Sequence, residues 1–174
     1  MIKENDMIRN LGDKKPKIHP SAFVSEAAYI VGDVEIGENS SVWPGAVVRA
    51  DFGKIVIGKN THIEDNCVLH TADSLEIGDN VIVGHAVSVH CRKVGNNCMI
   101  GIGAILLQGA EIGDGSLIAA GSLLAPNENV PPGSIYMGSP ARLRERLSGD
   151  KASMVSGGSD IYCELARKYR QQGI

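Results

Sequence analysis

Residues 94–125 read VGNNCMIGIGAILLQGAEIGDGSLIAAGSLLA and carry an aliphatic side chain at every sixth position. These positions are Val94, Ile100, Leu106, Ile112, Ile118 and Leu124. A period of six does not match the 3.6 residues of an α-helical turn, but it equals three strand repeats of two residues, so alternate side chains can point inward. The segment therefore predicts a series of short strands that bury the same side of every repeat.

The spacing of six extends back to Ile18, with three changes of phase, and gives 18 hexads over residues 18–125. A smaller residue often lies four positions after the aliphatic one, and glycine often follows it directly, which favours a tight corner. Three sides of six residues would close one coil, so the hexads predict about six coils. The pattern resembles that of the hexapeptide-repeat proteins, which form left-handed parallel β-helices. We therefore expect an all-β fold of this kind with a C-terminal α-helix.

The rest of the chain predicts a simple organisation around this β-helix. We expect an N-terminal arm over residues 1–17, the β-helix over 18–125, an exit loop and linker over 126–158, and a C-terminal helix over 159–173. Residues 148–158 are rich in Ser and Gly, which is typical of a linker. Ser159 can cap the helix, and Ile161, Leu165 and Tyr169 share one of its faces at i, i+4 and i+8.

The composition narrows the class of protein. The chain has 174 residues, enough for one domain, and a net charge of −3, which argues against a nucleic-acid or anionic-membrane partner. The N-terminus has no apolar signal-peptide core, and the longest apolar stretch, near residues 99–107, is too short to span a bilayer. The four cysteines show neither CxxC spacing nor a disulfide framework. We therefore expect a cytoplasmic protein with reduced thiols and no membrane contact.

Histidines supply the chemistry that the repeat can position. Arg49, His70 and His90 follow the aliphatic residues of hexads three apart, so they form one outward column with steps of about 4.8 Å. Two imidazoles on adjacent rungs can share one metal ion, because Zn–N bonds are about 2.0–2.1 Å long. His85 lies one side earlier and points off another face, where it could reach only a metal held by a neighbouring copy. A homotrimer of parallel prisms would then carry three interfacial sites, each with His70 and His90 of one chain and His85 of the next.

Three segments carry a closer resemblance, namely RADFGKIVIGKNTHIEDNCVLH (49–70), VGHAVSVHC (83–91) and IGIGAILLQGA (100–110). They are similar to segments of the γ-class carbonic anhydrase family, whose members are often described as ferripyochelin-binding-like or hexapeptide-transferase proteins. The sequence GSPAR at 138–142 fits the segment by which such chains leave the prism. The resemblance covers about residues 15–145.

This resemblance implies that His70, His85 and His90 are metal ligands, and that Arg49 and Asp51 link neighbouring subunits by a salt bridge. It also implies a lyase that hydrates CO2 reversibly to bicarbonate at the trimer interface. The reaction would use a hydroxide bound to Zn2+, because the ion lowers the pKa of its water from about 15.7 towards about 7. Fe2+ or Co2+ would accept the same three imidazoles.

Two features depart from the family pattern. The family commonly has Asn and Gln where this chain has His62 and Glu64. Glu64, which the repeat places beside His85, could accept a proton or act as a base, and His62 could carry protons near neutral pH. In addition, only the short loop TADSLE follows the first ligand, where the prototype has a long acidic insertion with a glutamate proton shuttle. Tyr136 could offer a hydrogen-bonding phenol near the site, as in some relatives.

The residues leave two other functions open. A hexapeptide-repeat acyltransferase would bind acyl-CoA between neighbouring prisms and use one histidine as a general base, without a metal. This chain has three histidines at its candidate site, where one would suffice, and it lacks the long protruding loop that many of those enzymes use. A non-catalytic, metal-stabilised trimeric scaffold is the other alternative, because a fold does not by itself determine a function.

Overall fold

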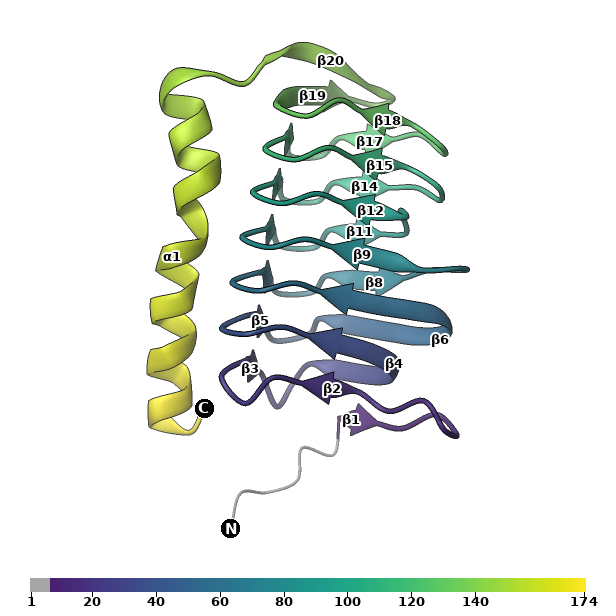
Figure 1. Cartoon of the computed structure of the whole chain (residues 1–174), viewed down its shortest axis with the longest axis vertical. Coiled ribbons are helices and arrows are strands. Elements are labelled where there is room, and N and C mark those ends of the chain that lie inside the picture. The colour runs from purple at the N-terminus through teal and green to yellow at the C-terminus, as the bar shows by residue number, and fades with distance from the viewer. Residues whose placement is uncertain (1–6) are drawn as a thin grey trace.

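The chain forms a parallel β-helix of about seven turns, followed by a single long helix (Figure 1). The computed structural model describes residues 7–174, without the side chains of residues 151, 154 and 156. The strands stack on three faces of a prism, and each pairs in parallel with its equivalents one turn away, apart from a closing antiparallel pair. The hexapeptide-repeat fold that the sequence predicts is therefore confirmed.

Two faces of the prism belong to one 12-stranded sheet that continues around a corner through the long strands β4 and β6. The first face contains β1 (Ile8–Arg9), β4 (Tyr29–Ile36), β6 (Val47–Ile57), β8 (Val68–His70), β11 (Ser88–Val89), β14 (Ile105–Leu106) and β17 (Leu123–Leu124). The second face adds β2 (Lys17–Ile18), β9 (Leu75–Ile77), β12 (Lys93–Val94), β15 (Glu111–Ile112) and β18 (Asn129–Val130) to the second halves of β4 and β6.

The third face is a separate 8-stranded sheet. It contains β3 (Phe23–Val24), β5 (Ser41–Val42), β7 (His62–Ile63), β10 (Ile82–Val83), β13 (Met99–Ile100), β16 (Leu117–Ile118), β19 (Ser134–Gly138) and β20 (Ala141–Arg146). β20 runs antiparallel to β19 and ends the stack, and the chain then crosses to the helix α1.

The core of the prism consists of the aliphatic positions of the hexads. On the first face, Val48 is in register with Leu69, and Val89 with Leu106, so hexads three apart lie directly above one another. The side chains at Val48, Leu69 and Leu106 have no exposed surface. Each fully buried aliphatic side chain of this kind stabilises the fold by roughly 1.5–3 kcal/mol relative to an exposed one.

The stack is longer than the six predicted coils. β1 pairs with β4 through Ile8 and Ile30, so part of the predicted N-terminal arm belongs to the prism. At the other end, the six-residue spacing continues to Val130 and Tyr136, which are 0% and 7% exposed. Residues 126–138, which we expected to form an exit loop, therefore complete the stack. Their prolines lie between strands, where no ladder hydrogen bond is lost.

The helix α1 spans Gly149–Gln172, so it includes most of the stretch that we predicted to be a linker. Ser159, the predicted cap, is buried within the helix rather than at its start. The cause is tertiary packing: Val155 is 2% exposed, and a Cβ added at Gly158 would lie 2.7 Å from the Cδ1 atom of Ile82. Close contact with the third face thus overrides the low helix propensity of a Ser- and Gly-rich segment.

An aromatic cluster fastens α1 to the third face. The cluster consists of Phe23, Trp43 and Ala166, with Tyr162, Leu165 and Tyr169 packed against it. The ring centroid of Trp43 lies 5.1 Å from those of Phe23 and Tyr169. The predicted packing face of the helix was partly wrong, because Ile161 is 71% exposed and Tyr162 faces the prism instead.

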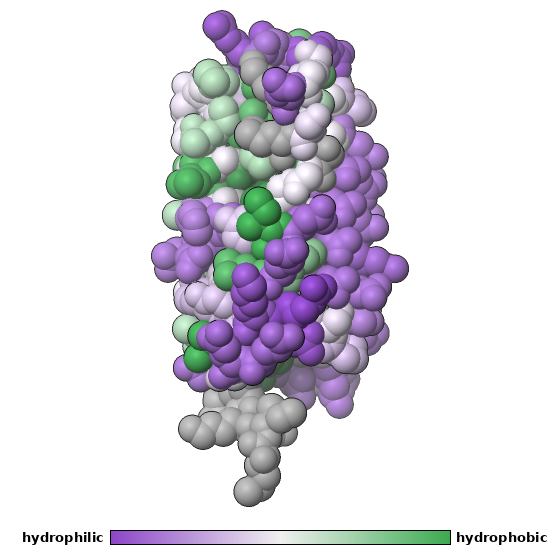
Figure 2. Space-filling model, turned by 90° about the vertical axis from the view of Figure 1, so that its left-hand side faces the viewer, coloured by the Kyte–Doolittle hydropathy of each residue, from purple (hydrophilic) through white to green (hydrophobic). Residues whose placement is uncertain are grey.

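The outer side of α1 is mainly polar, with small separate apolar patches (Figure 2). Over residues 7–174, no helix is both long and apolar enough to cross a bilayer.

Candidate metal centre

Two imidazoles are stacked on the first face of the prism. β8 pairs with both β6 and β11, so that Arg49 is opposite His70, and Leu69 is opposite Val89. His70 is the last residue of β8, and His90 directly follows β11. Their ring centroids lie 5.2 Å apart, with the ring planes inclined at 59°. The structure thus contains the column of Arg49, His70 and His90 that the repeat predicts.

A carboxylate orients one of these imidazoles. The Oδ1 atom of Asp51 lies 2.9 Å from Nε2 of His70, and Oδ2 pairs with Arg49 of the same chain. Burial alone would raise the pKa of Asp51, but hydrogen bonds from His70 and Arg49 outweigh it, so the pKa is lowered. A carboxylate that accepts the ring N–H of a histidine is the usual partner of a metal-binding imidazole, because it holds the tautomer and the ring orientation. The salt bridge of Arg49 and Asp51 forms within one chain here, and a link between subunits stays a prediction.

His85 lies at a different corner, between two carboxylates. Its Nε2 atom is 3.0 Å from Oε2 of Glu64, and its Nδ1 atom is 3.0 Å from Oδ2 of Asp65. The side chain is 46% exposed and comes after β10 on the third face, before the chain reaches β11 and His90. Within residues 7–174, no group of three His, Cys, Asp or Glu side chains is arranged to hold a metal ion. One chain therefore brings together His70 and His90, but not His85.

The stacked pair fits two ligands of a zinc centre. Two nitrogens that each lie about 2.0–2.1 Å from a tetrahedral ion are separated by about 3.4 Å. Imidazoles on adjacent rungs with centroids 5.2 Å apart are close enough for one nitrogen of each ring to lie at about that separation. The residues of a single chain thus fit part of a three-imidazole centre, together with its outer carboxylate, Asp51.

The helix α1 brings to His85 a residue that the sequence did not reveal. Glu64 is 4% exposed, and its Oε2 atom accepts the backbone N–H of His85 at 3.0 Å. The hydroxyl of Tyr162 hydrogen-bonds to the same carboxylate. Burial, the larger cause, and the contact with Glu64 both raise the pKa of Tyr162, so its phenol stays protonated. Glu64, His85 and Tyr162 line a cavity of about 230 Å³. The rest of its wall is formed by Ile82, Gly84, Met99, Ile100, Gly101 and Ile102.

Comparison with known proteins assigns the chain to a family. It is 40% identical over 166 residues to a carbonic anhydrase of Geobacillus kaustophilus, an alignment that covers 94% of this chain and 91% of the relative. It is also 35% identical over 170 residues to the mitochondrial gamma carbonic anhydrase 1 of Arabidopsis thaliana. The chain belongs to the γ-class carbonic anhydrase family. It covers only 62% of the length of that plant relative, which in turn matches 93% of this chain.

Two further comparisons place this member of the γ-class carbonic anhydrase family among the hexapeptide-repeat proteins. The bacterial transferase hexapeptide family, with six repeats, matches residues 15–50 and 93–126. A solved structure of a candidate acetyltransferase from Bacillus cereus superposes with a TM-score of 0.92 and 36% identity, over 94% of this chain and 96% of that one. Carbonic anhydrase and acetyltransferase are different chemistries on one fold, so the residues of the site must distinguish them.

Tyr136 does not lie at the candidate metal site of this γ-class carbonic anhydrase family member. It lies in β19, in register with Ile118 of β16, and its side chain packs within the core of the prism. β16 and β13 separate it from β10, the strand that precedes His85. The predicted phenol near the metal is therefore wrong at this position, because the six-residue spacing turns Tyr136 inward. Tyr162, from α1, is the tyrosine that lines the cavity beside His85.

His62 is also misplaced for its predicted role as a proton carrier. It is fully buried beneath α1, where Trp43 donates to Oγ of Ser41 at 2.7 Å and that hydroxyl contacts Nδ1 of His62 at 2.7 Å. The Nε2 atom lies 3.5 Å from Sγ of Cys163, and the ring stacks on that of Tyr162 with centroids 5.4 Å apart. Burial lowers the pKa of His62 to about 4, so the imidazole is neutral at pH 7 and helps to hold the helix.

We expect His62 to make the fold less stable in acid. The unfolded imidazole binds a proton near pH 6.5 and the buried one only near pH 4, so protons favour the unfolded chain. The stabilising contribution is complete above pH 6.5 and is lost as the pH falls through 4, by about 3 kcal/mol at most. Chemical denaturation at pH 7 and pH 4.5 should show a smaller acid loss in His62→Gln than in the wild type. The exposed His19→Gln is the control, and an unchanged pH dependence in His62→Gln would contradict the interpretation.

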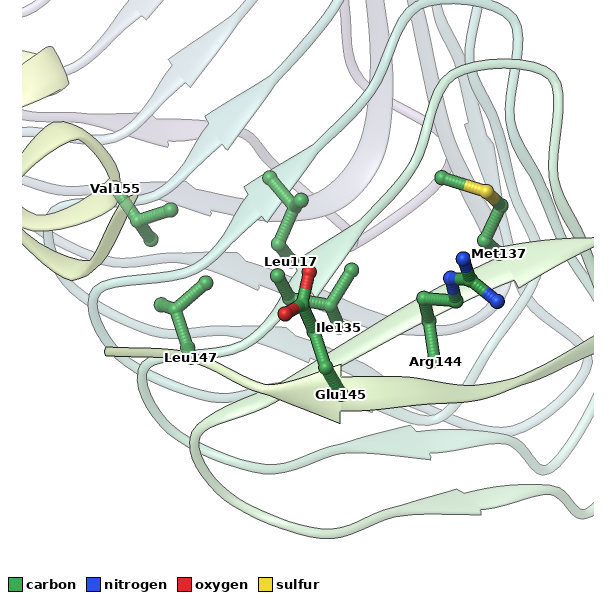
Figure 3. A pocket seen from close by; sticks show the side chains of 7 residues that line it. All are labelled: Leu117, Ile135, Met137, Arg144, Glu145, Leu147 and Val155. Carbon is green, nitrogen blue, oxygen red and sulfur yellow. The ribbon is translucent and has the colours of Figure 1, made fainter. Parts of the chain in front are cut away.

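A second cavity lies closer to the end of the prism where α1 begins (Figure 3). It has a volume of about 280 Å³ and lies between β16, β19, β20 and the first turns of α1. Its lining is Leu117, Ile135, Met137, Leu147 and Val155, with Arg144 and Glu145 from β20. The lining includes no histidine or cysteine and a single carboxylate, Glu145, so the cavity is separate from the candidate metal site.

Proposed function

We propose that the chain is a metal-dependent carbonic anhydrase that interconverts CO2 and bicarbonate, with each site shared between two copies in a homotrimer. The observation that carries the proposal is the stacked pair of His70 and His90, with His85 exposed at another corner. Since one chain joins only two of the three imidazoles, a complete centre requires a second copy, and threefold symmetry gives three equal sites. The carbonic anhydrases among the relatives support this proposal.

The centre would hold Zn2+ through His70 and His90 of one chain and His85 of the next, and Fe2+ or Co2+ would accept the same ligands. When bound, such an ion supplies a water whose pKa is lowered to about 7. Asp51 would keep the ring of His70 in its orientation through the 2.9 Å contact with Nε2. Arg49 would hold Asp51 in place, from its own chain or from a neighbouring one.

Glu64 is the proton acceptor that we assign to this centre, with Tyr162 as its positioning partner. An ionised carboxylate has no proton to donate, so Glu64 can accept one where the family's usual glutamine could only hydrogen-bond. The backbone N–H of His85 and the hydroxyl of Tyr162 both donate to it, which restricts its rotation. The apolar remainder of the 230 Å³ cavity would admit CO2, a small nonpolar molecule.

Metal removal tests this function directly. We expect the purified protein to be a trimer with about one metal ion per chain, and stopped-flow measurements to detect CO2 hydration. Chelation should abolish the hydration, and reloading with Zn2+ should restore it, because the water needs the ion to ionise near pH 7. Metal without hydration would favour the metal-stabilised scaffold. A protein that binds no metal, even after anaerobic preparation and reloading, would contradict the proposal.

Acyl transfer from CoA is the second candidate function, and the close structural match to a candidate acetyltransferase favours it. In that case one histidine would act as a general base, and no metal would be needed. Isothermal titration with acetyl-CoA distinguishes the two functions. Saturable binding, with transfer that survives chelation, would favour the acyltransferase, and we expect neither.

A further inference from the structure

A lysine of the N-terminal segment reaches the corner of β6 at residues 51–53, which includes Asp51 and which we call the corner loop. Backbone hydrogen bonds close a tight turn in which N–H of Leu11 donates to O of Lys14 at 2.9 Å, and the reverse pair measures 3.1 Å. From this turn the Nζ atom of Lys14 donates to the carbonyl oxygens of Asp51 at 2.5 Å and Phe52 at 3.0 Å. An ammonium group has three donors, so one side chain can hold two consecutive carbonyls. Lys14 thereby connects the start of the chain to a loop 37 residues away.

The corner loop lies at the bend of β6, where the hexad spacing is lengthened by three residues between Val48 and Ile57. Phe52 is 68% exposed, so it contributes no buried anchor, although its ring centroid lies 5.8 Å from that of His70. On another side, the loop packs closely against the next turn. The backbones are so close there that a Cβ added at Gly53 would overlap the carbonyl oxygen of Asp73. The contact with Lys14 therefore completes the support of this backbone.

The same loop determines where the Asp51 carboxylate lies. One oxygen accepts the backbone N–H of Phe52 at 3.1 Å and also contacts Nε2 of His70, while the other pairs with Arg49. A shift of the backbone at residues 51 and 52 would move the carboxylate relative to the ring that it orients. Outer carboxylates of this kind change metal affinity by about 10–100-fold when they are lost.

We propose that Lys14 is a positioning residue for the metal centre, which holds the carbonyls of Asp51 and Phe52 so that the Asp51 carboxylate keeps His70 oriented. The inference rests on the proposed function for its metal, but the contacts themselves lie within one chain. It assigns to the N-terminal turn a role in the site that neither the repeat nor the histidine column requires.

The test compares Lys14→Met with two matched variants. Lys14→Met keeps the aliphatic stem and removes the donors, Lys14→Arg restores donors, and Lys15→Met removes the charge of the exposed neighbour. Metal affinity is measured with Zn2+ against a competing chelator, and the metal-free proteins are compared by amide hydrogen exchange of residues 51–53 and by the NMR signals of the His70 ring. Thermal unfolding and trimer mass show whether folding and assembly are unchanged.

We expect Lys14→Met to bind Zn2+ about tenfold more weakly than the wild type, to exchange residues 51–53 faster and to shift the His70 signals. Lys14→Arg should recover most of the affinity, and Lys15→Met should match the wild type. Unchanged exchange and His70 signals in Lys14→Met, or an equal loss in Lys15→Met, would overturn the proposal. If the wild type binds no metal, the proposed function fails. Hydrogen exchange and the His70 signals then still decide whether Lys14 positions Asp51.

Discussion

Substitution of His90 by alanine should abolish metal binding and reduce CO2 hydration to the background rate. His90 is one of two imidazoles that a single chain stacks, 5.2 Å apart, so its removal leaves one ligand in the column. We expect the metal affinity to fall by more than the roughly 10–100-fold that the loss of an outer partner costs. Elemental analysis after dialysis against a weak chelator measures the metal content, and stopped-flow mixing measures hydration.

His19→Ala is the matched control for this result. His19 is exposed and hydrogen-bonds to Ser21 near the N-terminus, away from the column. It should leave the metal content and the hydration rate at wild-type values. Full metal content and full hydration in His90→Ala would show that the centre is not built on the stacked pair, and His70→Ala would then be expected to behave in the same way.

Replacement of Trp43 by alanine should have the largest effect on stability, a loss of about 3–5 kcal/mol. The ring is 5% exposed, lies 5.1 Å from two other aromatic rings, and donates through Nε1 to Ser41. Its removal leaves a cavity beneath α1 and releases Ser41 from its donor. For a chain of this length, such a loss lowers the melting temperature by about 10 °C or more. Circular dichroism is the suitable probe, because Trp43 is the single tryptophan of the chain.

The same substitution should loosen the site through the helix. Tyr162 belongs to the aromatic cluster and also hydrogen-bonds to Glu64, so release of α1 withdraws the phenol from that carboxylate. Limited proteolysis should therefore cut α1 of Trp43→Ala faster than that of the wild type. Ile161→Ala, on the exposed side of the same helix, should change the stability by no more than about 0.5 kcal/mol. An intact helix and a wild-type melting temperature in Trp43→Ala would refute the assigned role of the cluster.

The parts of the structure that follow from a repeat could be predicted from the sequence. The spacing of six predicts the buried positions, and the same register predicts that His70 and His90 share a column while His85 does not. The end of the repeat is harder to predict from the sequence. The prolines near Val130 are typical of an exit loop, although the aliphatic spacing continues past them. Tyr136 is expected near the site only by analogy with some relatives, and the continued spacing of six turns its side chain into the core instead.

Contacts between distant segments carried no sequence signal. The Ser- and Gly-rich start of α1 is helical because Gly158 packs against Ile82, which local propensity does not reveal. His62 fits a solvent-exposed proton carrier by residue type alone, and only the position of α1 above it makes it buried and neutral. Lys14 reaches its carbonyls through a fold in which the N-terminal turn lies beside the corner of β6.

The order of strands on the first face has a consequence for where local unfolding of the prism begins. A solenoid is close to a one-dimensional object, in which each turn contacts its neighbours, and local unfolding begins at the ends, where a turn has one neighbour instead of two. β8 and β11, which carry His70 and His90, have three strands of this face before them and two after. Fraying from either end must therefore pass through other turns before it disturbs the ligand pair. Hydrogen exchange should show the slowest amides in these middle turns, so the pair of His70 and His90 would stay in place through fluctuations that already melt the ends of the prism.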